Sequence, residues 1–127
     1  MKTQSAKAKG RRLQQWFRDL LVSKLGIHEE DIESRSMGAG GEDLIMARSA
    51  RQKFPYSIEC KNQEKINIWE SYKQANENSK DYEPVVVLKR NNHKPLILVD
   101  ATYFVELHNR VAKELTIDEL LTEDKVK

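Results

Sequence analysis

The chain has little of several residue types, and each shortage excludes a class of protein. Its single cysteine, Cys60, cannot form an internal disulfide, and such sparse cysteine is typical of the reducing cytosol. No apolar run approaches the roughly 20 residues of a membrane span, and the basic start lacks the apolar segment of a secretory signal. The three histidines, His28, His93 and His108, do not have zinc-ligand spacing. We therefore expect a soluble, cytoplasmic protein.

The length and the charge distribution limit the organisation further. The 127 residues suffice for one hydrophobic core but not two, so we expect a single domain over 1–127. The net charge is only +2, but basic residues crowd 2–18 and acidic residues gather at 118–124. This pattern suits a protein that holds phosphates and a metal ion, and an ordinary solubilising distribution is the alternative. Residues 1–9 are expected to form a flexible basic N-terminus, and 116–127 a short acidic helix and tail.

Helices are indicated by apolar periodicity. Apolar residues recur at spacings of three and four over 13–25, which predicts an amphipathic helix that ends at Gly26. Residues 69–80 and 101–108 also have a helical pattern. The sequence from Thr116 to Glu119 matches a capping box, which predicts the start of a last, separate helix. The aromatic and aliphatic side chains expected to be buried by the second and third helices are Trp69, Tyr103, Phe104 and Leu107.

Strands are indicated by alternating or continuous apolar runs. Residues 31–34 are expected to enter a short strand. Strands at 43–47 and 56–61 are expected to pair as an antiparallel hairpin with a long turn. The continuous apolar run at 85–88 is typical of a central strand covered on both faces, and a further strand follows at 96–99. A mixed sheet flanked by helices on both faces is therefore expected.

The rest of the chain is organised around the strand at 57–62. Its side chains alternate, so Ile58 and Cys60 face one side while Glu59 and Lys61 face the other. Cys60 is interpreted as a small apolar core residue and not as a nucleophile. A carboxylate and an ammonium group then stand side by side at the end of a buried strand.

A second acidic residue joins this pair. Asp43 follows the glycine-rich run 38–41, where the backbone can approach a ligand closely. Two carboxylates, from Asp43 and Glu59, can hold a hard divalent cation, and Lys61 can position an attacking water. This combination suits metal-assisted phosphodiester hydrolysis. The alternative is a solvated strand face, because Glu-x-Lys is common by chance.

These motifs resemble a known nuclease superfamily. Residues 34–43 (SRSMGAGGED) and 58–61 (IECK) resemble the PD-(D/E)XK nucleases, and within them the small Holliday junction resolvases of archaea and bacterial viruses. The similarity extends from about Lys9 to about Leu107. It implies an α/β fold with a mixed central sheet flanked by helices, the restriction-endonuclease-like core, with the metal at one edge of the sheet. It also implies a homodimer.

The resemblance assigns roles to individual residues. It makes Asp43, Glu59 and Lys61 catalytic, with Mg²⁺ held by Asp43, Glu59 and the backbone carbonyl of Ile58 or Cys60. Mn²⁺ is expected to substitute for Mg²⁺. The metal-binding glutamate that such resolvases carry on the first helix is absent here. Its expected counterpart is the neutral Gln14, because Gln15 points away from the apolar stripe.

Further residues are expected to have secondary roles. Glu42 is expected to supply the charge that Gln14 lacks, because it lies next to Asp43 at the end of the glycine-rich loop. Ser36 corresponds to a serine in the loop before the catalytic aspartate. Gln74 corresponds to a glutamine on the helix after Glu-x-Lys, which supports the catalytic lysine or a phosphate.

The function expected from these observations is metal-dependent resolution of four-way DNA junctions. One alternative is a nuclease of the same superfamily that acts on other branched, flapped or nicked DNA in repair or phage DNA processing. A second alternative is a non-catalytic nucleic-acid-binding protein, which the missing first-helix glutamate favours. The side chains expected to contact DNA are Lys7, Lys9, Arg11, Arg12, Arg35, Arg48, Arg51, Lys89 and Arg90.

Overall fold

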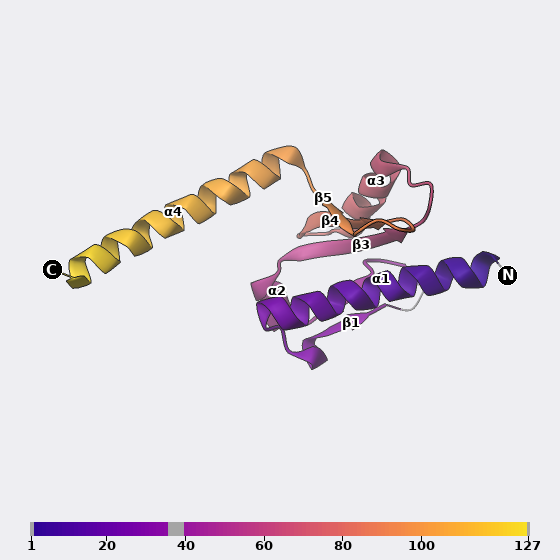
Figure 1. The fold of residues 1–127 in the computed structure, drawn as a ribbon, viewed down its shortest axis with the longest axis horizontal. Helices are drawn as coiled ribbons and strands as arrows, with labels where there is room; N and C mark the ends of the chain where they lie inside the picture. Colours follow the sequence, from indigo (N-terminus) through magenta and orange to yellow (C-terminus); the bar gives the residue numbers. More distant parts are fainter. Residues whose placement is uncertain (1, 36–39, 127) are drawn as a thin grey trace.

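The fold combines four α-helices with two small sheets in the part of the chain that the structure describes (Figure 1). The computed structural model describes residues 2–35 and 40–126, and the side chains of 5–35 and 40–115. The elements in chain order are α1 (Lys2–Leu25), the short 3-10 helix η1 (Glu29–Asp31), β1 (Ile32–Ser34), β2 (Leu44–Met46), α2 (Arg48–Lys53), β3 (Tyr56–Asn62), α3 (Ile68–Asn78), β4 (Glu83–Lys89), β5 (Leu96–Leu98) and α4 (Ala101–Val126).

The larger sheet is mixed and has the order β3-β4-β5. β3 pairs in parallel with β4, placing Cys60 opposite Val87, and β5 pairs with β4 in the antiparallel sense. Val86 and Val87 are fully buried, so the apolar run at 85–88 does form the central strand that it predicts. The smaller sheet is the antiparallel pair of β1 and β2.

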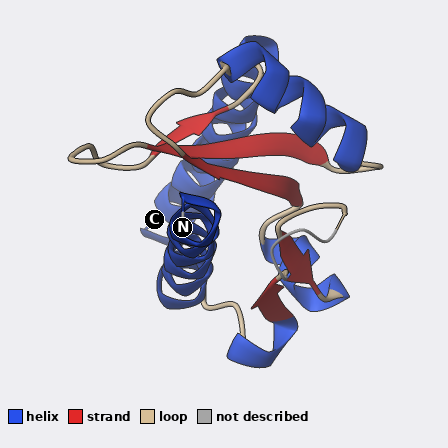
Figure 2. Cartoon of the chain, turned by 90° about the vertical axis from the view of Figure 1, so that its right-hand side faces the viewer, coloured by secondary structure: helices blue, strands red, loops and turns tan. Residues whose placement is uncertain are grey.

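Helices cover both faces of the larger sheet, which confirms the expected α/β class. Figure 2 shows the sheet between α3 above and α1 below. On the α1 side, Ile58 and Cys60 join Leu13, Phe17 and Leu21 in one core cluster. On the α3 side, the Ser57 hydroxyl donates to the carbonyl of Asn78. The alternation of β3 therefore separates an apolar face from a polar one.

The antiparallel hairpin expected between 43–47 and 56–61 is wrong. β2 pairs with β1, so that Ile32 lies opposite Met46, and the connection to β3 folds into α2. β3 instead takes the apolar strand β4 as its partner. The crossover helix α3 makes that pairing parallel.

Two helices are longer than the sequence predicts. α1 already includes residues 2–9, and α4 continues through the capping-box pattern at Thr116. A capping box favours a helix start, but no glycine or proline lies between Ala101 and Val126 to stop the preceding helix. Although α1 and α4 are long, no helix in the described ranges is apolar enough over a sufficient length to cross a membrane.

The expected burial of Trp69 and Phe104 is also wrong. Trp69 is 83% exposed in the first turn of α3, and Phe104 is 50% exposed. α4 contacts the body near its start and then runs away from it (Figure 1), so most of its apolar side chains between 101 and 115 face solvent.

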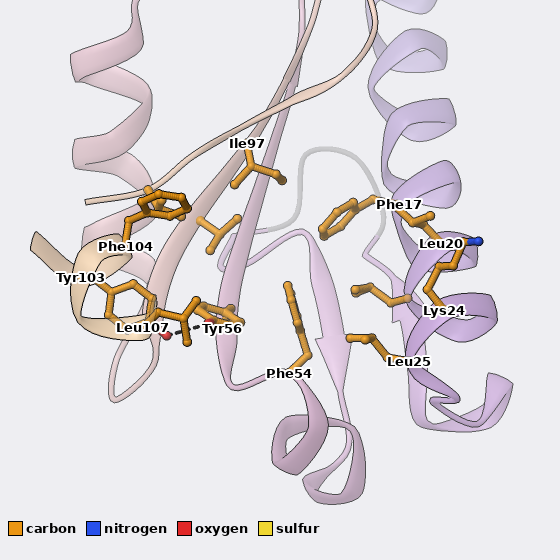
Figure 3. A pocket seen from close by; sticks show the side chains of 13 residues that line it. Phe17, Leu20, Lys24, Leu25, Phe54, Tyr56, Ile97, Tyr103, Phe104 and Leu107 are labelled. Carbon is orange, nitrogen blue, oxygen red and sulfur yellow. Dashed lines mark hydrogen bonds between the residues drawn. The ribbon is translucent and has the colours of Figure 1, made fainter. Parts of the chain in front are cut away.

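Where α4 starts, an apolar hollow of about 460 Å³ lies between it, α1 and the sheet (Figure 3). Phe17 and Leu20 of α1 line one side, and Tyr103 and Leu107 of α4 line the other. The Tyr103 hydroxyl donates to the Tyr56 hydroxyl at 2.5 Å across the base of this hollow. This contact joins the first turn of α4 to the start of β3.

Candidate functional site

Asp43 lies at the edge of β3 that β4 does not occupy. Its backbone N–H donates to the Ile58 carbonyl at 2.8 Å, and its carboxylate accepts from the Cys60 N–H at 2.6 Å. An unpaired strand edge presents backbone groups that need partners, and Asp43 satisfies two of them. Asp43 is therefore fixed against β3 by both its backbone and its side chain.

Glu59 and Lys61 lie on the α3 face of the same strand. Glu59 is 5% exposed, and its Oε2 atom is buried without a hydrogen-bond partner. The Lys61 Nζ atom lies 3.7 Å from Glu59 Oε1 and donates to Gln74 Oε1 at 2.8 Å. Gln74 thus holds the lysine, as the resemblance implies for that glutamine.

Burial disfavours the charged form of both carboxylates, and the negative charge of Asp43 further disfavours the charged form of Glu59. Burial raises the pKa of Glu59 to about 7, with the negative charge of Asp43 as the second cause and Lys61 opposing both. Burial also raises the pKa of Asp43, while the Cys60 N–H, Lys61, Gln14 and Arg35 lower it. Ionised carboxylates buried together favour a cation between them.

Gln14 reaches this site from α1. It is 2% exposed, its amide donates to the Asp43 carboxylate, and its Oε1 atom accepts from the Ser34 hydroxyl at 2.5 Å. Gln15 is exposed and donates to Asp19. The structure therefore brings together Asp43 and the amide chosen from the helical periodicity.

Two polar residues of this site were missed in the sequence. Ser34 supports Gln14 and carries no recognisable signal by itself. Asn78 donates to the Gly41 carbonyl at 3.5 Å, and its side chain also lowers the pKa of Glu59. Asn78 follows Gln74 by four residues on α3, so the helical repeat was a usable signal.

Glu42 does not take the place expected for it. Its carboxylate forms an ion pair with Arg51, and both side chains are mostly buried. Arg51 also donates to the Tyr56 carbonyl and lies over the Tyr82 ring at 4.3 Å. The expectation that Glu42 supplies charge to the metal site is therefore not supported, and Arg51 is not available to a DNA phosphate.

Arg35 packs on the loop that leads to Asp43. Its Nε atom donates to the Glu42 carbonyl at 2.6 Å, and its guanidinium lies over Gly41. Gly41 has φ of +93°, a conformation that favours glycine. Arg35 thus holds this loop and lowers the pKa of Asp43 by its charge.

The remaining basic residues that were expected to contact DNA fall into two groups. Lys9, Arg12 and Lys89 line a common groove, whereas the other basic side chains are exposed on separate elements. The exposed group is Lys7 and Arg11 on α1, Arg48 on α2, and Arg90 in the β4–β5 turn.

Ser36, which the resemblance assigns to the loop before Asp43, lies outside the described residues.

The oxygen atoms at this edge fit a hard divalent cation. Within the described ranges, no three or more His, Cys, Asp or Glu side chains are grouped so that they could hold a metal ion, and Asp43 and Glu59 are the two acidic side chains that meet at this edge. Mg²⁺ binds through one or two carboxylates and keeps several waters. The buried Glu59 Oε2 is a free acceptor, and the Cys60 carbonyl points to the same side as its N–H, toward Asp43.

The Cys60 thiol does not belong to this donor set. It is packed in the core on the α1 side, as expected, and burial raises its pKa well above the ordinary value. A protonated thiol in an apolar core is neither a nucleophile nor a ligand for a hard cation. Only the backbone of Cys60 contributes to the candidate site.

Comparison of the chain with protein-family models, with curated proteins and with solved structures finds no match.

The raised pKa of Glu59 predicts a pH-dependent stability difference in metal-free protein. The folded state holds a proton on Glu59 up to about pH 7, whereas the unfolded state loses it near 4.5. Wild type should therefore lose stability relative to Glu59→Gln as the pH rises through this window, by roughly 2–3 kcal/mol. Urea unfolding of both proteins with EDTA from pH 4.5 to 8 measures this. A difference that is independent of pH would contradict the burial of an ionisable Glu59.

The contact between Gln14 and Asp43 predicts how a carboxylate at position 14 would act. Gln14→Glu should lower the Mg²⁺ or Mn²⁺ concentration that gives half-maximal activity, because a third carboxylate increases the negative charge at Asp43. Gln15→Glu adds the same charge on the exposed side of α1 and is the matched control. Equal behaviour of the two variants would place Gln14 outside the metal site.

Proposed function

We propose that the chain is a metal-dependent DNA endonuclease that hydrolyses phosphodiester bonds in four-way junctions. The observation that carries the proposal is the pair of buried carboxylates, Asp43 and Glu59, at the open edge of β3, with Lys61 beside them. Burying two like charges together costs stability, so the arrangement favours a role in holding a cation.

Each residue of the site then has its own role in the reaction. Asp43 and Glu59, with the Cys60 carbonyl, would hold Mg²⁺ and orient it toward the DNA. When bound, the ion supplies positive charge that polarises the scissile phosphate and lowers the pKa of a coordinated water. Lys61, kept in place by Gln74, stabilises negative charge that develops on the phosphate or orients the attacking water.

Supporting residues keep this constellation rigid. Gln14 and Ser34 orient the Asp43 carboxylate from α1 and β1, and Arg35 holds the preceding loop. The restriction-endonuclease-like core, the homodimer and the cytoplasmic location belong to this proposal. A four-way junction presents two strands for incision, and two copies of the chain would supply two such sites.

Two alternatives remain distinct from junction resolution. A nuclease acting on other branched, flapped or nicked DNA would use the same catalytic residues. The neutral Gln14 favours a non-catalytic nucleic-acid-binding protein, because it lowers the charge available to a metal. The buried Glu59 argues against such a protein, since mere binding does not need an ionisable group at that cost.

Cleavage of labelled DNA tests the proposal. We expect Mg²⁺-dependent, paired incision of a four-way junction, with much slower cleavage of a linear duplex and of a flap. Preferred cleavage of the flap or of nicked DNA would assign the site to the first alternative. Binding without cleavage at any Mg²⁺ or Mn²⁺ concentration would assign it to the second.

Substitutions of the three central residues should abolish cleavage and spare binding. We expect Asp43→Asn, Glu59→Gln and Lys61→Ala to retain less than a few per cent of wild-type cleavage, because each removes a metal ligand or the positive charge beside it. Junction binding in EDTA should change little. Glu33→Gln and Lys65→Ala, which alter exposed residues of the same types, are the controls. Substantial cleavage by either acid variant would refute the site.

DNA binding should depend strongly on salt. Each phosphate neutralised by a basic side chain releases counterions, with a log–log slope of roughly −0.9 per contact on duplex DNA. Lys7→Gln and Arg11→Gln should each flatten this slope by about that amount in a duplex-binding titration. Lys113→Gln, on the projecting part of α4, should leave the slope unchanged. Identical slopes for all three would show that the basic face of α1 is only a solvated surface.

A further inference from the structure

A groove of about 490 Å³ lies beside the candidate site, on the α1 face of the sheet. β3 leads directly into it, because Asn62, one residue after Lys61, forms part of its wall. In Figure 1 the C-terminal end of β3 lies over the N-terminal half of α1, where this groove is found. The lining residues on which the argument depends are Lys9, Arg12 and Trp16 of α1, Asn62 of β3, and Lys89 at the end of β4.

The groove carries positive charge that is not neutralised within the described part of the chain. None of its lining residues is acidic, and the side chains of Lys9 and Arg12 make no hydrogen bond or ion pair there. Lys89 donates to the carbonyls of Arg90 and His93 and so holds the turn in place. An anionic ligand would therefore meet two cations with free donors.

Trp16 gives the groove an aromatic wall. The indole is 45% exposed although it belongs to the apolar stripe of α1, and its neighbour Phe17 is in the core. An exposed indole beside two cations is the combination by which proteins bind single-stranded nucleic acid, since bases stack on the ring while phosphates pair with the cations. The bases of an intact duplex are already stacked on each other and cannot stack on the indole.

Asn62 adds a polar group without a partner. Its Nδ2 atom donates to the Lys9 carbonyl at 2.9 Å, but its Oδ1 atom is buried and accepts no hydrogen bond. Asn62 therefore ties the end of β3 to the backbone of α1 and holds this part of the groove wall in place.

We propose that this groove binds an unpaired segment of DNA, with one base stacked on Trp16 and the flanking phosphates paired with Lys9 and Arg12. The role of such binding rests on the proposed function: unpaired nucleotides at a branch point would enter the groove, and the strand would pass the C-terminal end of β3 to reach Lys61 on the opposite face. The binding itself requires neither metal nor cleavage. It can therefore be tested separately from the nuclease activity.

The test measures binding of the full chain, in EDTA, to a fluorescein-labelled 12-nucleotide oligo(dT). Trp16→Ala should weaken binding by about tenfold, since loss of one base–aromatic stack typically has an effect of this size. Trp16→Phe should keep most of the affinity. Trp69→Ala removes the other tryptophan, which is 83% exposed on α3, and should have less than a twofold effect.

Two further ligands separate stacking from simple charge attraction. An abasic oligomer has the same phosphates but no bases, and a duplex of the same length has bases that are not free to stack. Both should bind wild type more weakly than oligo(dT) and should be insensitive to Trp16→Ala. In the Trp69→Phe background, oligo(dT) should also quench the fluorescence of Trp16.

Each possible result either supports or contradicts the binding of unpaired DNA in the groove. A loss of at least fivefold for Trp16→Ala on oligo(dT), absent for Trp69→Ala and for the abasic oligomer, supports it. A smaller loss, or equal losses for the two tryptophans or the two oligomers, overturns it. A groove that binds oligo(dT) through Trp16 in a protein that cleaves no DNA would leave the inference standing and refute the nuclease. Cleavage of the junction by a protein that binds oligo(dT) independently of Trp16 would support the nuclease and contradict the proposed role of the groove.

Discussion

The hydrogen bond from the Cys60 N–H to the Asp43 carboxylate determines the geometry on which the candidate site depends. It joins a loop that precedes β2 to the open edge of β3, and it does so with a carboxylate that is mostly buried. Burial raises the pKa of Glu59, and the like charge of Asp43, once it is fixed there, raises this pKa further. The remaining contacts offset this cost: Gln14 and Arg35 act on Asp43, and Lys61 acts on both acids. A cation would offset it most directly.

β3 also connects the candidate site to the groove. Its α3 face and free edge present the paired acids and Lys61, while its last residue, Asn62, enters the basic groove with Trp16. α1 contributes to both regions, since Gln14 reaches Asp43 and Lys9 and Arg12 line the groove. A DNA strand lying in the groove would have to pass the C-terminal end of β3 to reach Glu59 and Lys61, because these two residues lie on the opposite face of the sheet.

Much of the site was readable from local patterns, and the errors have physical causes. The period of two in 57–62 separated Cys60 from Glu59 and Lys61, and the helical period selected Gln14 over Gln15. Pairing of strands depends on contacts distant in sequence, so the expected hairpin was wrong. The ion pair of Glu42 with Arg51 depends on where α2 places the arginine, which no local pattern reports. Trp69 and Phe104 were assigned to the core because they are large and apolar, but the fold leaves at least half of each side chain exposed.

The central claim is that Asp43 and Glu59 together hold one divalent cation, and direct metal binding tests it most simply. Free Mn²⁺ can be followed by electron paramagnetic resonance while the full chain is titrated at pH 8, where both carboxylates are expected to be ionised. The account predicts that wild type removes Mn²⁺ from the free pool, that added Mg²⁺ releases it, and that Asp43→Asn and Glu59→Gln each abolish this binding. Equal Mn²⁺ binding by wild type and both variants would contradict the account.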